Sequence, residues 1–563
     1  MTRIQNPILP GFNPDPSICR VGDDFYVATS TFEWFPGVQI WHSQNLKDWR
    51  LLTRPLNEPR LLNLRGVQSS AGIWAPCLSF HDGIFYLVYT VVSKWRGETP
   101  VDAGCFKDTP NFLTTTNSLE NGLWSDPVYL NASGFDPSFF HDDNGKTWLT
   151  NMEWDYRGDP TYFSGIVLQE YSKAKQMLVG PVRKIFTGSP IGRTEGPHVY
   201  KRNGWYYLMT AEGGTSYEHA VSLARSKQIT GPYEIHPKNP LLQSFENRTE
   251  DKKLLLELAG SSDNQVFFPE HWYSRPQRAG HGSMCILSEK EWALVHLCGR
   301  PIQGSIACTR GRETAVQRII WKEDDWPYVV DEEEKENNLA EFSVSFTWEN
   351  ENADTQSTHF SFTDTFNDPQ GINPHFRFLR HRPGMRQDSD KGCLYLQGKE
   401  SPVSEINQSL VAVSVPFSDY RIETRLHYSP KSFQQMAGLL VRYDERNQYY
   451  LHITYDELRG CVIGVLRFIK GVCLYPTYQV AKNADEYRFA AEIRGLSGQY
   501  FYGDKQGKWK EIGPELDMRQ LSDEYTWPEG FTGTFAGMGC HDLTGKGTEA
   551  MFTYFSMHEL QHV

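Results

Sequence analysis

Three carboxylates in this sequence stand in similar local settings and could share one chemical task. Asp15 occurs in NPDPSI, Asp136 in GFDPSFF and Glu195 in RTEGPHVY. Proline on both sides of Asp15 fixes the backbone and disfavours a helix, so this carboxylate is held at the start of an extended segment. Any one of the three alone is a common turn former. If they converge, their repulsion and desolvation form an arrangement that proteins seldom retain without chemical use.

Carboxyl groups placed across a sugar ring perform glycosidic hydrolysis. One protonates the leaving oxygen, and the other activates water or attacks the anomeric carbon. A third carboxyl can tune the acid. Phe32, Trp74 and Trp154 stand close to these segments and could form an apolar platform for a sugar face, although each could equally pack within the fold.

A repeated pattern of strands must position these residues. Segments that begin at Asp15, Ala75, Asp136, Glu195 and, more weakly, His281 recur at steps of about sixty residues, the last step being longer. In each, a strand passes through a tight turn into a second strand that carries an aromatic residue eleven or twelve positions after the lead: Tyr26, Tyr86, Trp148, Tyr207 and Trp292. Five such hairpins predict an all-β fold, a five-bladed propeller around an axial channel.

The propeller geometry brings the lead residues together. If the first strand of each repeat lies next to the axis, then Asp15, Asp136, Glu195 and His281 point toward one end of the same channel. We therefore expect one site there, built from distant parts of the sequence.

The chain is long enough for two domains. We expect the propeller over 1–325, a solvated linker over 326–344 that contains DEEEKENN, and an antiparallel β-sandwich over 345–563, where apolar and polar residues alternate. Residues 246–280 are expected to form an inserted loop.

Composition excludes several classes of partner. The net charge of −13, without a basic stripe, argues against nucleic acid. No signal peptide and no apolar run long enough for a membrane span is visible, so we expect a cytoplasmic protein with no membrane partner. The ten cysteines are scattered without a C-x-x-C pair, which favours buried reduced thiols.

The motifs NPDPSI, TFEWFPGVQIWHSQNLKDW, GIWAPC, GFDPSFF, RTEGPHVY and GRETA, in this order, resemble glycoside hydrolase family 43, in particular its two-domain β-xylosidases. The resemblance covers nearly the whole chain. It implies a concanavalin-like sandwich, an inverting mechanism, and release of xylose from the non-reducing end of β-1,4-xylo-oligosaccharides. It also allows α-L-arabinofuranosidase activity, and many relatives are dimers or tetramers, so we expect a homo-oligomer.

The resemblance also assigns roles to residues. It implies that Asp15 is the general base, Glu195 the general acid, and Asp136 the residue that orients and tunes the acid. Arg312 in GRETA matches a residue that grips sugar hydroxyls, with a structural salt bridge as the alternative. His281 matches a channel histidine that in some relatives helps to hold a divalent cation such as Ca²⁺; a hydrogen-bonded histidine is the alternative, and no cofactor is expected to be required.

An enzyme that removes single terminal sugars needs a closed pocket, which an open propeller lacks. We expect the sandwich to supply a wall through FTGTFAGMGCHD, with Phe535 as the first candidate, Phe531 as its rival, and core packing as the alternative for both. Two other functions stay open: an arabinan-directed α-L-arabinofuranosidase, and a sugar-binding propeller without catalysis.

Overall fold

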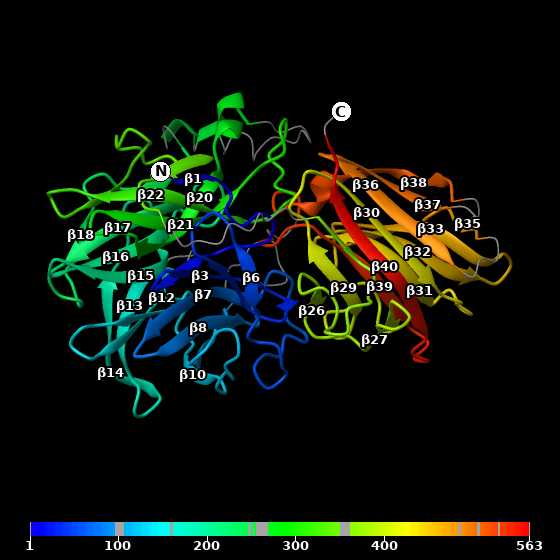
Figure 1. Ribbon diagram of the computed structural model, residues 1–563, viewed down its shortest axis with the longest axis horizontal. Helices are drawn as coiled ribbons and strands as arrows, with labels where there is room; N and C mark the ends of the chain where they lie inside the picture. The colour runs from blue at the N-terminus through cyan, green and yellow to red at the C-terminus, as the bar shows by residue number, and fades with distance from the viewer. Residues whose placement is uncertain are drawn as a thin grey trace.

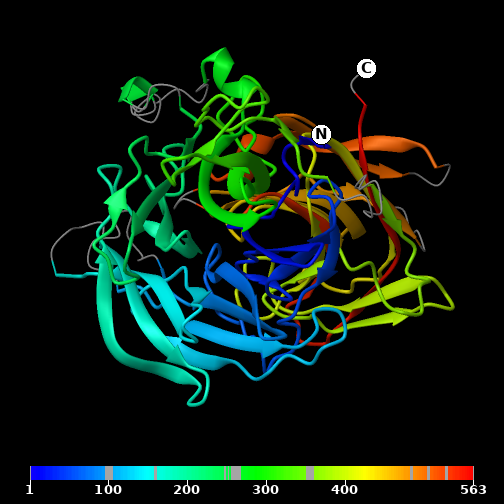
Figure 2. The same ribbon diagram turned by 60° about the vertical axis from the view of Figure 1, so that its left-hand side comes forward.

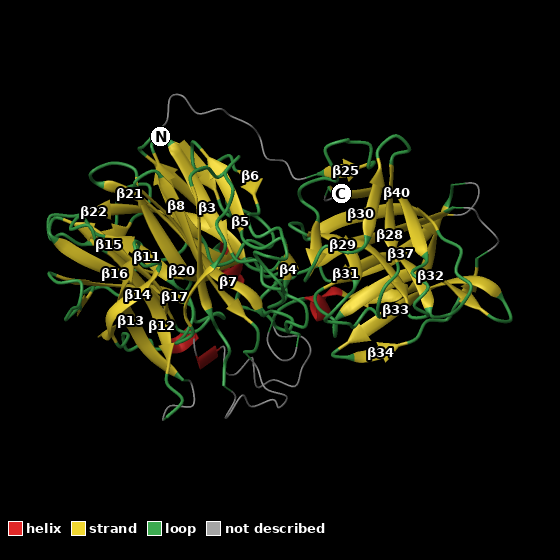
Figure 3. Cartoon of the chain, turned by 90° about the horizontal axis from the view of Figure 1, so that it is seen from below, coloured by secondary structure: helices red, strands yellow, loops and turns green. Residues whose placement is uncertain are grey.

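The computed structural model describes residues 2–95, 106–157, 162–245, 249–251, 253–254, 268–349, 361–481, 486–503, 507–526 and 530–561. Two all-β domains lie side by side along the longest axis (Figure 1), and the view coloured by secondary structure shows strands in nearly every layer (Figure 3). Sequence and structure thus agree on the all-β class.

Five antiparallel sheets form the propeller, and each predicted hairpin repeat opens one of them. Blade 1 consists of β2 (Ser17–Val21), β3 (Asp24–Thr29), β5 (Gln39–Ser43) and β6 (Arg50–Thr53). Blade 2 consists of β7 (Gly72–His81), β8 (Ile84–Val92), β9 (Asn111–Thr116) and β10 (Val128–Asn131). Blade 3 consists of β11 (Ser138–His141), β12 (Thr147–Trp154), β13 (Phe163–Ser172) and β14 (Met177–Phe186).

The remaining two blades complete the predicted five. Blade 4 consists of β15 (Glu195–Arg202), β16 (Trp205–Glu212), β17 (Ala220–Ser226) and β18 (Glu234–Ile235), with β19 (Leu242–Gln243) also paired to β17. Blade 5 consists of β20 (Gln277–Ile286), β21 (Glu291–Gly299), β22 (Glu313–Trp321) and β23 (Pro327–Val329). In Figure 2 the colours run from blue through cyan to green around this domain.

The N-terminal segment closes the ring against blade 5. The backbone amide of Leu9 donates to the carbonyl of Thr314 at 3.1 Å, and Thr314 donates back at 3.2 Å. Further along, Asn13 N donates to the carbonyl of Arg312 at 2.8 Å. This closure places Asn13, two residues before Asp15, against Arg312, which stands almost three hundred positions later in the chain.

The expected linker over 326–344 is a solvated connection only in its middle, where residues 332–336 are exposed. Its first part contains β23, the outer strand of blade 5, and β24 (Ser343–Phe346) pairs with β1 (Thr2–Gln5). Val344 and Phe346 are buried with Ile4 and Phe25 in one apolar cluster. The alternation of these residues matches a strand, whereas the acidic run beside it dominated the sequence pattern. The propeller therefore continues to about Thr347.

The second domain is a sandwich of two antiparallel sheets, as predicted. One contains, in spatial order, β27 (Met385–Asp388), β28 (Cys393–Gln397), β40 (Glu549–Glu559), β30 (Asp419–His427), β36 (Tyr487–Arg494), β37 (Ser497–Gly503) and β38 (Trp509–Asp517), with β25 (Phe362–Asp364) paired to β40. The other contains β34 (Val472–Leu474), β33 (Gly460–Ile469), β32 (Gln448–Asp456), β31 (Gln435–Arg442), β39 (Phe535–Asp542), β29 (Ser409–Ser414) and β26 (Arg377–Leu379), with β35 (Gln479–Val480) paired to β33.

The two domains are joined through the sheet as well as through side chains. Strand β4 (Trp34–Phe35) of the propeller pairs with β26 of the sandwich, so it extends the second sheet across the domain boundary (Figure 3). Phe12 and Trp34 from the propeller share one buried apolar cluster with Phe535 and Leu410 from the sandwich. Removing the sandwich would expose this apolar surface to water.

Two short 3-10 helices, η1 (Glu270–Ser274) and η2 (Met518–Leu521), lie outside the sheets. Much of the predicted inserted loop over 246–280 lies outside the described residues, at 246–248, 252 and 255–267. No described helix is long and apolar enough to cross a bilayer. The described cysteines are free thiols, and Cys461 and Cys473 are only half-buried, in contrast to the fully buried set that we expected.

Candidate active site

One turn recurs at the entry of all five blades and sets the direction of the site residues. Asp15, Ala75, Asp136, Gly196 and His281 have φ angles of 52°, 36°, 56°, 57° and 47°. The first four of these residues precede a proline. Left-handed backbone is costly for residues other than glycine, and such strain gathers at functional sites.

This turn corrects the alignment of the fourth repeat. Its lead position is occupied by Gly196, and Glu195 stands one residue earlier. The corresponding earlier position holds Trp74 in blade 2 and Phe135 in blade 3. The sequence pattern merged these two positions because Glu195 was the nearest carboxylate to the repeat.

The three predicted carboxylates nonetheless meet in one cavity of about 370 Å³. Asp15, Asp136 and Glu195 all line it and are 9%, 5% and 7% exposed. The other lining residues are Phe32, Trp74, Trp95, Lys107, Phe135, Trp154, Tyr162, Phe163, Arg193, Gly214, Thr215, Ser216, His281, Arg312 and Phe531. A cavity of this size, with apolar walls and a few convergent polar groups, is suited to a small ligand.

Asp15 is held by a hydrogen-bond chain that links blades 1 and 2. Ser30 Oγ donates to Asp15 Oδ2 at 2.7 Å, and the backbone amide of Ala75 donates to Ser30 Oγ at 2.7 Å. Ser30 lies just after β3, so a neighbouring strand of the same blade fixes the carboxylate. This geometry limits rotation of the Asp15 side chain, as a positioned acid or base requires.

Asp136 is connected to the residue next to Glu195. The backbone amide of Gly196 donates to Asp136 Oδ2 at 2.9 Å. Burial, followed by the negative charges of Glu195 and Asp15, raises the pKa of Asp136 well above its ordinary value. A carboxyl bound to the Gly196 amide restrains the backbone from which the Glu195 side chain projects.

Glu195 has the electrostatic setting of an acid. Burial first, and then the negative charge of Asp15, raises its pKa to about 8, while the positive charges of Arg312 and Arg193 oppose the rise. At neutral pH this carboxyl therefore holds its proton. A proton donor of this kind is what the departing oxygen of a glycoside requires.

Arg312 is both a salt-bridge residue and a cavity residue, so the two alternatives from the sequence coexist. Its Nε donates to Asp523 Oδ2 at 3.1 Å, and its Nη1 donates to Thr215 Oγ1. Its Nη2 is buried and has no hydrogen-bond partner within the described part of the chain. Two sides of the guanidinium thus fix its orientation, and the side chain as a whole lines the cavity.

Asp523 comes from the sandwich, so the second domain helps to set the site. Its Oδ2 also accepts from Arg278 Nη1 at 2.6 Å, and Tyr443 OH donates to its Oδ1. A Cβ at Gly311 would lie 2.1 Å from the carbonyl oxygen of Thr532, and the φ angle of Gly311 is +79°. Only glycine permits this close approach between the domains beside Arg312.

Aromatic rings form the walls. The three residues proposed from the sequence, Phe32, Trp74 and Trp154, all line the cavity. The Trp74 indole nitrogen donates to the carbonyl of Ser70 at 2.9 Å, and that of Trp154 donates to Thr109 Oγ1 at 3.1 Å. Their polar edges are thereby satisfied, and their ring faces remain available for apolar contact.

Phe535 is not a wall residue, which corrects our first candidate. It is fully buried and stacks on Trp34 with ring centroids 3.8 Å apart, in the apolar cluster between the domains. Its rival Phe531 lines the cavity, with its ring centroid 4.6 Å from that of Trp95 and 5.7 Å from that of Trp74. Phe535 begins β39 and packs against Trp34 and Phe12 of the propeller, whereas Phe531 precedes that strand in a loop.

His281 lines the cavity and is 6% exposed. Its Nδ1 lies 4.0 Å from Asp136 Oδ2, beyond a hydrogen bond. Burial lowers the pKa of His281, an effect that the charge of Asp15 opposes. Within the described ranges, no group of three or more His, Cys, Asp or Glu side chains that could hold a metal ion is found.

Several cavity residues were missed in the sequence. Phe135 could have been found, because it stands immediately before a lead aspartate, as Trp74 stands before Ala75. Arg193 and Thr215 lie in loops after β14 and β16, where no repeat marks them. Their recruitment depends on how these loops fold over the end of the channel.

Comparison with known proteins agrees with this architecture. Residues 4–327 match the model of glycosyl hydrolases family 43, and residues 363–558 match the beta xylosidase C-terminal concanavalin A-like domain. The chain is 42% identical to a xylosidase/arabinosidase 43B of Humicola insolens, over 100% of this chain and 99% of that one. It is 39% identical to a beta-xylosidase of Bacillus subtilis, over 99% of this chain and 100% of that one.

A solved structure shares the whole fold. The crystal structure of a xylan beta-1,4-xylosidase from Bacillus halodurans is 42% identical, covers 99% of this chain and 100% of its own, and has a TM-score of 0.85. The propeller and the sandwich are therefore parts of one recognised architecture. This chain belongs to glycosyl hydrolase family 43 and is a glycosidase.

Proposed function

We propose that this chain is an exo-acting, inverting glycoside hydrolase that releases D-xylose from the non-reducing end of β-1,4-xylo-oligosaccharides. The observation that carries the proposal is the meeting of three propeller carboxylates in one small cavity whose wall includes Phe531 of the sandwich. A cavity of about 370 Å³ suits a terminal sugar better than the interior of a polymer. The names of the two relatives and of the solved structure support xylose as the sugar.

In this proposal Glu195 is the general acid and Asp15 the general base. Glu195 holds a proton at neutral pH and gives it to the glycosidic oxygen, while Asp15 takes a proton from the attacking water. The Ser30 hydroxyl fixes the Asp15 carboxylate for this step. Arg312, which lines the cavity, binds a sugar hydroxyl, and the aromatic walls contact the apolar face of the ring.

A second activity, release of α-L-arabinofuranose, has a specific observation in its favour. The relative from Humicola insolens is named for both xylosidase and arabinosidase activity and is 42% identical over the full chain. The non-catalytic alternative, a sugar-binding propeller, is disfavoured because it gives no use to a buried acid beside two further carboxylates.

A proton NMR time course on xylobiose tests the proposal, with Asp15→Ala as the control for contaminating activity. An inverting enzyme acting on a β-xyloside releases the α-anomer first, before mutarotation. Appearance of the β-anomer first would refute inversion. Cleavage of an α-L-arabinofuranoside without cleavage of xylobiose would refute the proposal in favour of the second activity. Cleavage of neither substrate would favour a sugar-binding propeller without catalysis.

A further inference from the structure

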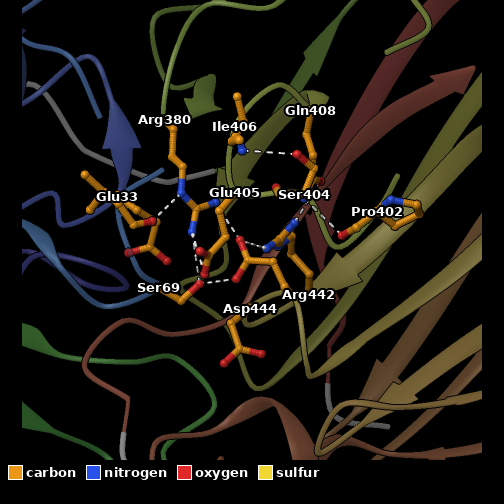
Figure 4. Close-up of polar contacts among 12 residues, drawn as sticks. Glu33, Ser69, Arg380, Pro402, Ser404, Glu405, Ile406, Gln408, Arg442 and Asp444 are labelled. Atoms are coloured by element: carbon orange, nitrogen blue, oxygen red, sulfur yellow. Dashed lines mark hydrogen bonds and ion pairs between the residues drawn. The ribbon is translucent and has the colours of Figure 1, made fainter. Parts of the chain in front are cut away.

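A buried cluster of charged side chains lies where the propeller meets the sandwich, outside the cavity wall. We call Glu33, Arg380, Arg442 and Glu445 the interdomain ion cluster; they are 1%, 1%, 1% and 6% exposed. Glu33 belongs to the propeller, immediately before β4, and the other three belong to the sandwich. Figure 4 shows Arg380 reaching between Glu33 and Ser69, with Arg442 nearby.

Arg380 connects the two domains directly. Its Nη1 lies 2.5 Å from Glu445 Oε1 within the sandwich. On the propeller side its Nε donates to the carbonyl of Val67 at 2.7 Å, and its Nη2 donates to Ser69 Oγ at 3.3 Å. Arg442 Nη2 lies 3.3 Å from Glu445 Oε1, which makes Glu445 the shared counterion. The propeller segment 67–70 is therefore held against the sandwich by charge-assisted contacts.

Glu33 holds the end of the same segment. The backbone amide of Ser70 donates to Glu33 Oε2 at 3.0 Å, and the backbone amide of Arg380 donates to the Glu33 carbonyl at 2.8 Å. Burial raises the pKa of Glu33 to about 7, against the lowering effect of the Arg380 charge and with a further raising effect from Glu445. A buried carboxyl in this position depends on its hydrogen bond and its cation.

Ser70 connects this cluster to the cavity. Its carbonyl accepts from the Trp74 indole nitrogen at 2.9 Å, and its Oγ accepts from the backbone amide of Phe531 at 3.1 Å. Its own φ angle of 62° is one that a serine seldom adopts without support. One residue thus fixes two cavity walls, Trp74 from the propeller and Phe531 from the sandwich.

We propose that Glu33 is a positioning residue for the sugar pocket: it holds Ser70, and through Ser70 it sets the mutual placement of Trp74 and Phe531. This inference rests on the proposed function of the cavity. Glu33 itself does not line the cavity and takes no part in the chemical step. Its loss acts on substrate binding, because wall residues displaced by about 1 Å lose much of their contact with a bound ring.

A matched control separates positioning from general stability. Glu291 is also a buried propeller carboxylate: it accepts from Arg318 Nε at 2.5 Å and from the backbone amides of Thr347 and Trp348 at 2.9 and 2.8 Å. It does not line the cavity. Glu291→Ala should lower the melting temperature as Glu33→Ala does, while leaving KM unchanged.

The experiment compares Glu33→Ala, Glu33→Gln and Glu291→Ala in the full chain. Steady-state kinetics on xylobiose should show KM raised about tenfold in Glu33→Ala. In Glu33→Gln the amide oxygen still accepts from the Ser70 amide, so KM should stay within about twofold of the original value. An unchanged KM in folded Glu33→Ala, or an equal rise in Glu291→Ala, would overturn the proposal. If Glu33→Ala does not fold, Glu33→Asp replaces it: its carboxylate is one methylene shorter and should not reach the Ser70 amide, so a raised KM is expected and an unchanged KM would contradict the proposal.

A readout without substrate separates this inference from the function on which it rests. Hydrogen–deuterium exchange should be faster in peptides that contain Phe531 and Ser70 in Glu33→Ala than in Glu291→Ala. Original protein that fails to cleave xylobiose refutes the proposed function, while this difference in exchange would still establish the positioning contact. Equal exchange in both variants refutes the contact, whatever the substrate.

Discussion

The floor and the rim of the cavity come from different domains and are built in different ways. The floor consists of Asp15 and Asp136, which occupy a backbone turn repeated at the entry of the blades, and of Glu195, which stands one residue before that turn in blade 4. The rim contributed by the sandwich is Phe531, held in a loop by the hydroxyl of Ser70. Repetition places chemically active groups without long loops, whereas a rim that closes one end of the channel needs a contact from outside the repeat.

The two regions also differ in electrostatics. The floor gathers buried carboxyls, and burial first, then the negative charge of Asp15, raises the pKa of Glu195 to about 8. The sandwich contributes an apolar ring and, behind it, Asp523, which orients Arg312. We therefore expect floor variants to change the chemical step and rim variants to change binding.

The largest effect is expected on the floor. Asp15→Ala removes the group that takes a proton from water, so kcat on xylobiose should fall by about 10² to 10⁴, with KM less affected. The measurement is steady-state kinetics on xylobiose and on an aryl xyloside. If the variant retains nearly the original kcat on both substrates, Asp15 takes no part in the reaction.

Substitutions at the rim should raise KM. Phe531→Ala removes an apolar wall from the cavity, so KM for xylobiose should rise about tenfold, which corresponds to about 1.4 kcal/mol, with kcat nearly retained. Phe535→Ala is the contrast: it empties a buried position stacked on Trp34 and should lower the free energy of unfolding by about 3–5 kcal/mol without changing KM. The reverse outcome would identify Phe535, and not Phe531, as the pocket residue.

The smallest effect concerns pH. Glu195 must be protonated to act, and its pKa is raised to about 8, so kcat/KM should fall as the pH rises through about 8. The positive charge of Arg193 lowers that pKa; its removal in Arg193→Ala should therefore shift the alkaline limb to higher pH. A pH–rate profile measures this shift, and movement to lower pH would mean that Arg193 does not act on Glu195 through its charge.

The contrast between floor and rim also explains what the sequence predicts. The five hairpin repeats predict the propeller and point to Asp15 and Asp136, because a local turn repeats locally in sequence. The same repeat pattern places Glu195 one position off, because it aligns a carboxylate with the lead position that Gly196 occupies in the structure. Only family resemblance supplied the distinct roles of acid and base.

Sequence failed where the fold depends on long-range packing. Phe531 and Phe535 stand four residues apart in the same aromatic, glycine-rich stretch, and nothing local distinguishes the wall residue from the core residue. Their difference arises from where β39 begins and from the contact with Ser70 of the other domain. The sequence likewise does not predict β24 at the end of the expected linker over 326–344, because its partner is β1 at the other end of the propeller.

The assignment of Glu195 as the acid is the central claim, and its dependence on the leaving group tests it most directly. Glu195→Ala should lose about 10² to 10⁴ of the rate on xylobiose, whose departing oxygen needs a proton. On an aryl xyloside with an acidic phenol the same variant should retain far more activity than Asp15→Ala does, because that leaving group hardly needs protonation. Equal losses on the two substrates in Glu195→Ala would contradict the assignment.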